Sequence, residues 1–157
     1  MQQIKLICVT LFMDNQELPD TEGSAGDALK RAHANLLTAL IEMEAVVRSH
    51  SPDRAMLADI RWKLSRASGV RLRLLEERIY PALLASISPI DAEKVAKLRE
   101  ANAPLRLAST QHVANWTLDR AVEAWPEYRQ ASSLMTASMR TRLNAERETL
   151  YPLLAKI

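Results

Sequence analysis

Two histidines, two arginines and one glutamate stand on the apolar stripes of predicted helices, where they could do chemistry together. These residues are His33, Arg71, His112, Arg142 and Glu146. Imidazole nitrogens and carboxylate oxygens are common ligands of iron. Arginine stays protonated and has no lone pair, so it binds carboxylates or small anions rather than metals. The residue types therefore allow either a metal site or an anion site.

The spacing of these residues predicts that they share one level of the molecule. Residues on two antiparallel helices face each other when they are equally far from the connecting turn. The midpoint of 33 and 71 is 52, and that of 71 and 112 is 91.5. The midpoint of 112 and 142 is 127. Each midpoint falls in or beside a predicted break, so we expect one inward-facing side chain from each of four helices.

The elements that must position these residues are four amphipathic helices, in which apolar residues recur at steps of three and four. The breaks between the helices are SPDR (51–54), SPID (88–91) and EAWPEY (123–128). Ser24 and the serines before Pro52 and Pro89 are predicted helix N-caps. Pro104 is expected to kink or split the third helix. The fold class predicted is all-α, an antiparallel up-down-up-down four-helix bundle over residues 24–157, preceded by an extension and loop over 1–23.

Two segments repeat each other at an offset of 71 residues. RLRLLEERIYPALL (71–84) and RLNAERETLYPLLA (142–155) align without gaps, and both carry Tyr-Pro near the end. Proline disrupts the helical hydrogen-bond ladder, so a Tyr-Pro inside a helical run is unusual. Its presence at matching places in two helices indicates related structural roles.

With these motifs, the chain resembles the hemerythrin-like (HHE) cation-binding family over about residues 24–157. The family places a single His on its first and third helices, and His-x-x-x-Glu on its second and fourth, each followed by Leu-Tyr/Phe-Pro. The resemblance assigns the single histidines to His33 and His112 and a Glu position to Glu146. Three family positions are altered, because arginine or leucine replaces the ligand: Arg71, Leu75 and Arg142.

The resemblance implies a non-haem di-iron centre, which this chain can supply only in part. The remnant metal ligands are His33, His112 and Glu146, which in principle form a mononuclear facial triad. The fixed charges of Arg71 and Arg142 would repel a bound cation. We therefore expect no cofactor, and an ion pair between Arg142 and Glu146 or a small anion or carboxylate ligand bridging the two arginines.

Composition narrows the classes of function. The formal net charge is +2 with both signs interspersed, and no basic tract indicates nucleic-acid binding. No apolar run is long enough to span a membrane. Cys8 is the lone cysteine, which is typical of a reducing cytoplasm. Asp14 and Glu17 follow the short apolar run near the start, and no small-residue cleavage site is present, so we expect no signal peptide.

The sequence therefore predicts a cytoplasmic, non-enzymatic sensor or anion-binding bundle with an incomplete metal site. One alternative is an iron-binding hemerythrin-like protein for oxygen, iron or redox sensing, with a single iron on the three remnant ligands or a di-iron site that recruits Glu76 or Glu148. The other alternative is a structural or partner-binding bundle in which the buried polar groups only set the helix register.

Overall fold

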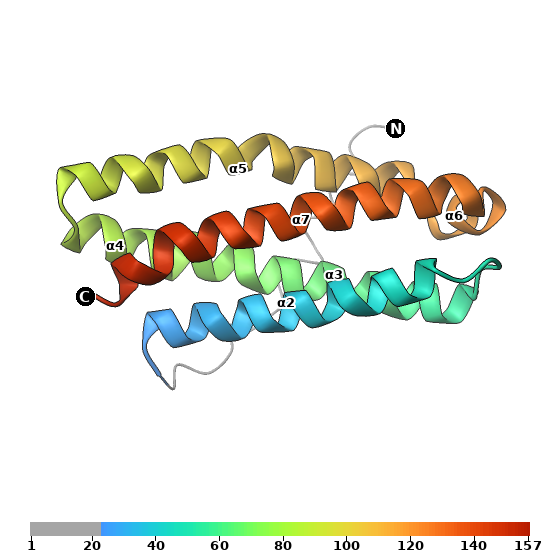
Figure 1. The fold of residues 1–157 in the computed structure, drawn as a ribbon, viewed down its shortest axis with the longest axis horizontal. Coiled ribbons are helices and arrows are strands. Elements are labelled where there is room, and N and C mark those ends of the chain that lie inside the picture. Colours follow the sequence, from blue (N-terminus) through green and yellow to red (C-terminus); the bar gives the residue numbers. More distant parts are fainter. Residues whose placement is uncertain (1–22) are drawn as a thin grey trace.

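The computed structural model describes residues 23–157, and these residues are mostly helical with no β-strand among them (Figure 1). The elements in chain order are α2 (Ala25–Val47), α3 (Arg54–Leu74), the π-helical turn η1 (Leu75–Ile79), α4 (Tyr80–Ser86), α5 (Pro89–Asn115), α6 (Leu118–Glu123) and α7 (Trp125–Leu154). The predicted all-α class is confirmed. The predicted extension over 1–23 lies outside the described residues except for Gly23.

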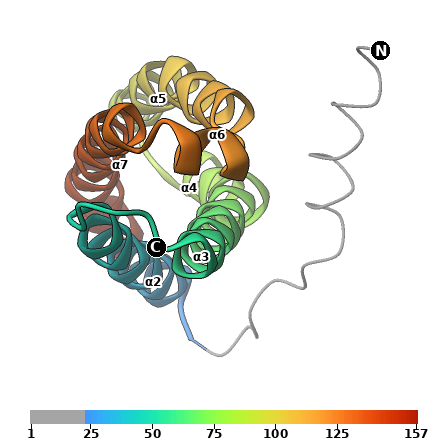
Figure 2. The ribbon, with the colours of Figure 1, turned by 90° about the vertical axis from the view of Figure 1, so that its right-hand side faces the viewer.

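The long helices α2, α3, α5 and α7 run along the long axis of the molecule (Figure 1). The elements α3, η1 and α4 follow one another without a break and form one continuous helical segment. Seen from one end, α2 lies between α3 and α7, and α5 lies beside α7 (Figure 2). Within the described part of the chain, no helix combines the length and the apolar character needed to cross a membrane.

Two of the three predicted serine caps are confirmed. The Ser24 and Ser88 hydroxyls each accept a hydrogen bond from the backbone N–H three residues later, at the starts of α2 and α5. The prediction for Ser51 is wrong, because the Asp53 carboxylate caps α3 by accepting from the Met56 N–H at 2.9 Å. Serine and aspartate side chains can both accept a hydrogen bond from an unpaired backbone N–H in the first turn of a helix. Because α3 begins at Arg54, the residue directly before it, Asp53, is the cap.

The prolines act differently from one helix to the next. Pro104 was expected to kink or split the third helix. It does not split it, because α5 continues through Pro104, which is on the exposed face, where an unpaired carbonyl can bond to water. Pro81 instead follows a π-helical turn, in which the Tyr80 N–H donates to the Leu75 carbonyl. A wider turn accommodates the proline ring and its missing N–H. Pro152 leaves α7 α-helical to its end.

The connection between the last two long helices lies earlier than predicted. Helix α5 ends at Asn115, and Thr117 caps the short helix α6 by accepting from the backbone N–H three residues later. Only Ala124 separates α6 from α7. The connection is therefore centred near residue 120 rather than at 127, and this shift changes which residues of α5 and α7 face each other.

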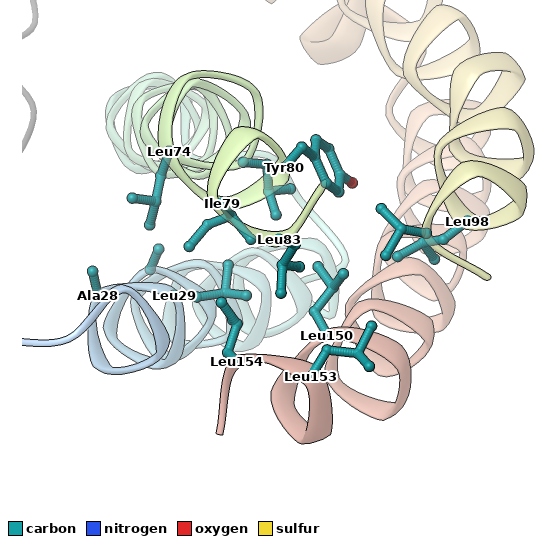
Figure 3. Close-up of a cluster of buried hydrophobic side chains, with 13 residues drawn as sticks. Ala28, Leu29, Leu74, Ile79, Tyr80, Leu83, Leu98, Leu150, Leu153 and Leu154 are labelled. Carbon is teal, nitrogen blue, oxygen red and sulfur yellow. The ribbon is translucent and has the colours of Figure 1, made fainter. Parts of the chain in front are cut away.

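Apolar side chains form successive clusters along the long axis. The largest contains leucines from α2, α3, η1, α4, α5 and α7, which point toward one another at the end where α4 lies (Figure 3). A middle cluster consists of Leu36, Leu40, Met139 and Leu143. A third, around Tyr128, lies at the opposite end. Along α7, Glu146 comes between Leu143 of the middle cluster and Leu150 of the largest one, so a polar layer separates these two apolar clusters.

Candidate functional site

The Glu146 carboxylate is the centre of the buried polar layer. Its side chain is 1% exposed, and Nη1 of Arg71 donates to its two oxygens at 2.6 and 2.8 Å. His33 Nε2 lies 2.9 Å from Oε2, and Asn102 Nδ2 donates to Oε1 at 3.2 Å. Side chains from α2, α3 and α5 thus converge on one carboxylate of α7. This convergence confirms that His33, Arg71 and Glu146 lie together.

The proton positions on His33 follow from its partners. Glu146 accepts hydrogen bonds as a carboxylate, so His33 Nε2 carries the proton that it shares with Oε2. The other ring nitrogen, Nδ1, lies 2.8 Å from the Tyr151 hydroxyl and accepts its proton in the neutral imidazole. Tyr151 comes from the second Tyr-Pro, and its ring also stacks on the His33 ring. The repeated motif therefore supplies a hydrogen-bond partner for the polar layer.

Electrostatics keep Glu146 ionised despite its burial. Removal from water acts to raise the pKa of this carboxyl, but the hydrogen bond from His33 and the positive charge of Arg71 outweigh that effect and lower the pKa below its usual 4.5. A buried carboxylate held by several donors is stable as an anion. Arg71, which is 2% exposed, has its charge matched by this carboxylate.

Arg142 is buried beside this network without a matching negative charge. Arg142 is 3% exposed, and its Nη2 donates to the Ser109 hydroxyl at 3.3 Å. No carboxylate of residues 23–157 forms an ion pair with it, so the predicted pair with Glu146 is wrong. Burial and the positive charges of Arg71 and Arg106 lower the pKa of Arg142 to about 10, although the nearby Glu146 carboxylate acts to raise it. The guanidinium therefore remains charged at neutral pH.

A small cavity lies next to Arg142, between the α3–α4 segment and the helices α5 and α7. Its volume is about 10 Å³, which is enough for a water molecule. The residues that line it are Arg71, Leu72, Leu75, Glu76, Tyr80, Arg99, Asn102, Arg106, Arg142 and Glu146. Near the surface, the Glu76 carboxylate forms ion pairs with Arg99 at 2.7 Å and with Arg106 at 3.1 Å. The charged lining thus has four arginines and two glutamates.

His112 does not join the site, so its predicted place at the common level is wrong. Its ring stacks on Tyr128, with centroids 6.0 Å apart, in the cluster at the opposite end. Tyr128 and Glu146 are eighteen residues apart on α7, or about 27 Å along a helix. Burial and the nearby charge of Arg61 lower the pKa of His112. The cause of the error is the early connection around α6, which moves α5 along α7 and brings Asn102 to the level of Glu146.

The donors around Glu146 do not fit the di-iron group that the resemblance implies. Both ring nitrogens of His33 and both oxygens of Glu146 already have protein partners, and Arg71 directs positive charge at the carboxylate. Leu75 borders the cavity with apolar atoms. In residues 23–157, no group of three or more His, Cys, Asp or Glu side chains is arranged to hold a metal ion.

The carboxylates that a di-iron site would have to recruit have other positions. Glu76 is committed to two arginines, and Glu148 is exposed on the outer face of α7. Glu76 borders the same cavity as Glu146, but its oxygens are held by these arginines, and Glu148 does not line the cavity. The arrangement can hold charge and bind an anion, but it lacks the converging lone pairs that a metal requires.

Several residues of the site were not predicted. Asn102 and Ser109 continue the stripe of Val95 and Leu98 at steps of four and seven, so the apolar pattern would have found them if polar residues had been allowed on it. Arg99 and Arg106 lie on the same helix, and their approach to Glu76 on η1 depends on how two helices pack. No periodicity in the sequence carries that information.

Comparison of this chain with family models, with curated proteins and with solved structures found no match. The function is therefore argued from the chemistry of the site.

Proposed function

We propose that this protein is an antiparallel four-helix bundle of the hemerythrin-like type in which an arginine cluster replaces the metal centre. Its function is to bind a small anion without catalysis, as a sensor. The bundle topology is supported by the contacts of α2 with α3 and α7 and of α5 with α7. The resemblance is supported by the meeting of His33 and Glu146 in a buried polar layer, where the family has ligands.

The observation that carries the proposed function is the burial of Arg142 without an ion-pair partner among the described residues. A guanidinium that is 3% exposed and paired only with a hydroxyl carries a desolvation cost of several kcal/mol. An anion in the adjoining cavity would remove that cost through charge-assisted hydrogen bonds. The folded protein is then stabilised by an amount that grows with the logarithm of the anion concentration once this exceeds the dissociation constant.

The test is thermal unfolding at constant ionic strength in a buffer whose own anion is large, such as gluconate. Chloride, nitrate, acetate and phosphate are added in turn. At ten times its dissociation constant a ligand adds about 1.4 kcal/mol of stability, which raises the Tm of a domain of this size by about 3–6 °C. We expect a saturable rise for at least one of these anions in the wild-type protein.

Arg142→Met and Arg140→Met are the matched variants. Both remove an arginine from α7, but Arg140 pairs with Glu44 on the outside of the molecule. Arg142→Met is expected to fold, to gain about 1 kcal/mol in gluconate because a buried unpaired charge is gone, and to lose the anion response. Arg140→Met should keep the response. A purely structural role predicts the same gain in stability without any anion response in the wild type.

Metal analysis separates this proposal from the iron-binding alternative. Protein purified from iron-supplemented cells is expected to contain far less than one iron per chain. Stoichiometric iron with near-ultraviolet charge-transfer absorption would overturn the proposal.

A further inference from the structure

Three charged side chains stand on the solvent side of the cavity beside Arg142. Glu76, Arg99 and Arg106 line the cavity, and their side chains are 33%, 44% and 41% exposed. Arg142 itself is 3% exposed. An anion from solution therefore meets these three side chains before it reaches the buried guanidinium.

The deeper part of the cavity has a hydrogen-bond donor that lacks an acceptor. The Nε–H of Arg71 is buried and has no hydrogen-bond partner, although Nη1 of the same side chain donates to Glu146. A buried N–H group without an acceptor is rare in folded proteins. Arg142 lines the same cavity and has no ion-pair partner among the described residues. An anion there would accept charge-assisted hydrogen bonds from both arginines.

Arg106 is placed to supply a third donor. Asn102, Arg106 and Ser109 follow one another on α5 at steps of four and three, so they share one face of the helix. Asn102 donates to Glu146, and Ser109 accepts from Arg142. Burial is the largest cause of the lowered pKa of Arg142, and the positive charge of Arg106 is among the others. Arg106 thus lies near Arg142, between two residues that contact the buried polar layer.

Glu76 engages Arg106 at the solvent side. Its carboxylate pairs with Arg106 at 3.1 Å and with Arg99 at 2.7 Å. Arg99 has a further partner, because its guanidinium lies over the Tyr80 ring at 4.7 Å from the centroid. Water screens direct repulsion between an anion and the partly exposed Glu76. The main effect of Glu76 on an anion in the cavity is therefore to occupy Arg106.

We propose that Glu76 competes with the bound anion for Arg106, so that Arg106 is a third arginine of the anion site and Glu76 sets its affinity. The inference rests on the proposed anion-binding function and names the residues that regulate it. An anion that enters the cavity takes over the hydrogen bond that Arg106 donates to Glu76. Glu76 keeps its ion pair with Arg99 in that state.

The test measures dissociation constants from the dependence of Tm on anion concentration in gluconate, for chloride, nitrate, acetate and phosphate in turn. Glu76→Gln is expected to tighten binding about two- to fivefold, the range that a partly exposed ion pair carries. Glu77→Gln is the matched control, because it removes the same charge from an exposed neighbour that does not line the cavity. It should leave the dissociation constant unchanged.

A double-mutant cycle isolates the competition from a general effect of charge. Arg106→Met is expected to weaken binding, and adding Glu76→Gln to it should then bring no gain. If the wild type responds but Glu76→Gln has no effect, or tightens binding equally without Arg106, the competition is wrong and the proposed function stands. If no anion stabilises the wild type through Arg142, both are wrong.

Discussion

Replacing Glu146 with glutamine removes the single negative charge on which the buried polar layer converges. The amide has one acceptor oxygen in place of two, and it faces donors from Arg71, His33 and Asn102. Its NH₂ group must then meet another donor. Arg71, at 2% exposure, would be left as a second buried cation beside Arg142.

The expected loss follows from this burial. Breaking a buried ion pair by removing one partner costs about 3–5 kcal/mol, because the remaining charge keeps its desolvation penalty. The matched control is Glu44→Gln on the outer face. Its carboxylate pairs with Arg140 at 2.8 and 2.9 Å, but the two side chains are 27% and 35% exposed. Water screens that pair, so its loss should cost about 1 kcal/mol or less.

Urea unfolding followed by circular dichroism at 222 nm measures both variants. We expect the midpoint of Glu146→Gln to fall at least three times as far as that of Glu44→Gln, with unchanged dependence on denaturant. Equal losses in the two variants would refute the reasoning that Glu146 is the charge partner of a desolvated arginine.

Three further predictions concern the same groups. The double variant Arg71→Met/Glu146→Leu removes the ion pair as a whole, and we expect it to lose less stability than Glu146→Gln in the same urea unfolding. A loss in the double variant equal to the sum of the losses in the two single variants would contradict this. Because the folded pKa of Glu146 is depressed, its contribution is present above pH 4.5 and is lost as the pH falls through the folded value, so the wild type should lose stability with acid more steeply than Glu146→Gln. His112 has a lowered pKa through burial and Arg61, so its imidazole should titrate below 6.5 in nuclear magnetic resonance spectra, and a midpoint above 6.5 would contradict its placement beside Tyr128.

Much of the secondary structure could be predicted from local chemistry. Steps of three and four among apolar residues indicate helices, and the serine caps of α2 and α5 satisfy the amides of their own first turns. The cap at Asp53 and the break at Thr117 were missed because several neighbouring residues can cap equally well. The choice among them depends on where the helix meets its neighbours.

The polar layer was predicted in part. The placement of His33, Arg71 and Glu146 in one layer followed from turn midpoints, because the short α2–α3 connection leaves little freedom in register. His112 was misplaced because α6 lengthens the last connection and moves α5 relative to α7. A midpoint argument holds only when the turn is correctly located.

The sequence by itself determined that the chain is helical, and it predicted inward-facing arginines at positions where the family resemblance expects metal ligands. Periodicity and side-chain chemistry are local properties, so they can be read without the fold. Only the tertiary structure decided that Glu146 pairs with Arg71, that Asn102 takes the place expected for His112, and that Arg142 is buried without an ion-pair partner beside a small cavity. These outcomes depend on helix register and on packing across α3, α5 and α7, where a shift of one turn exchanges one partner for another.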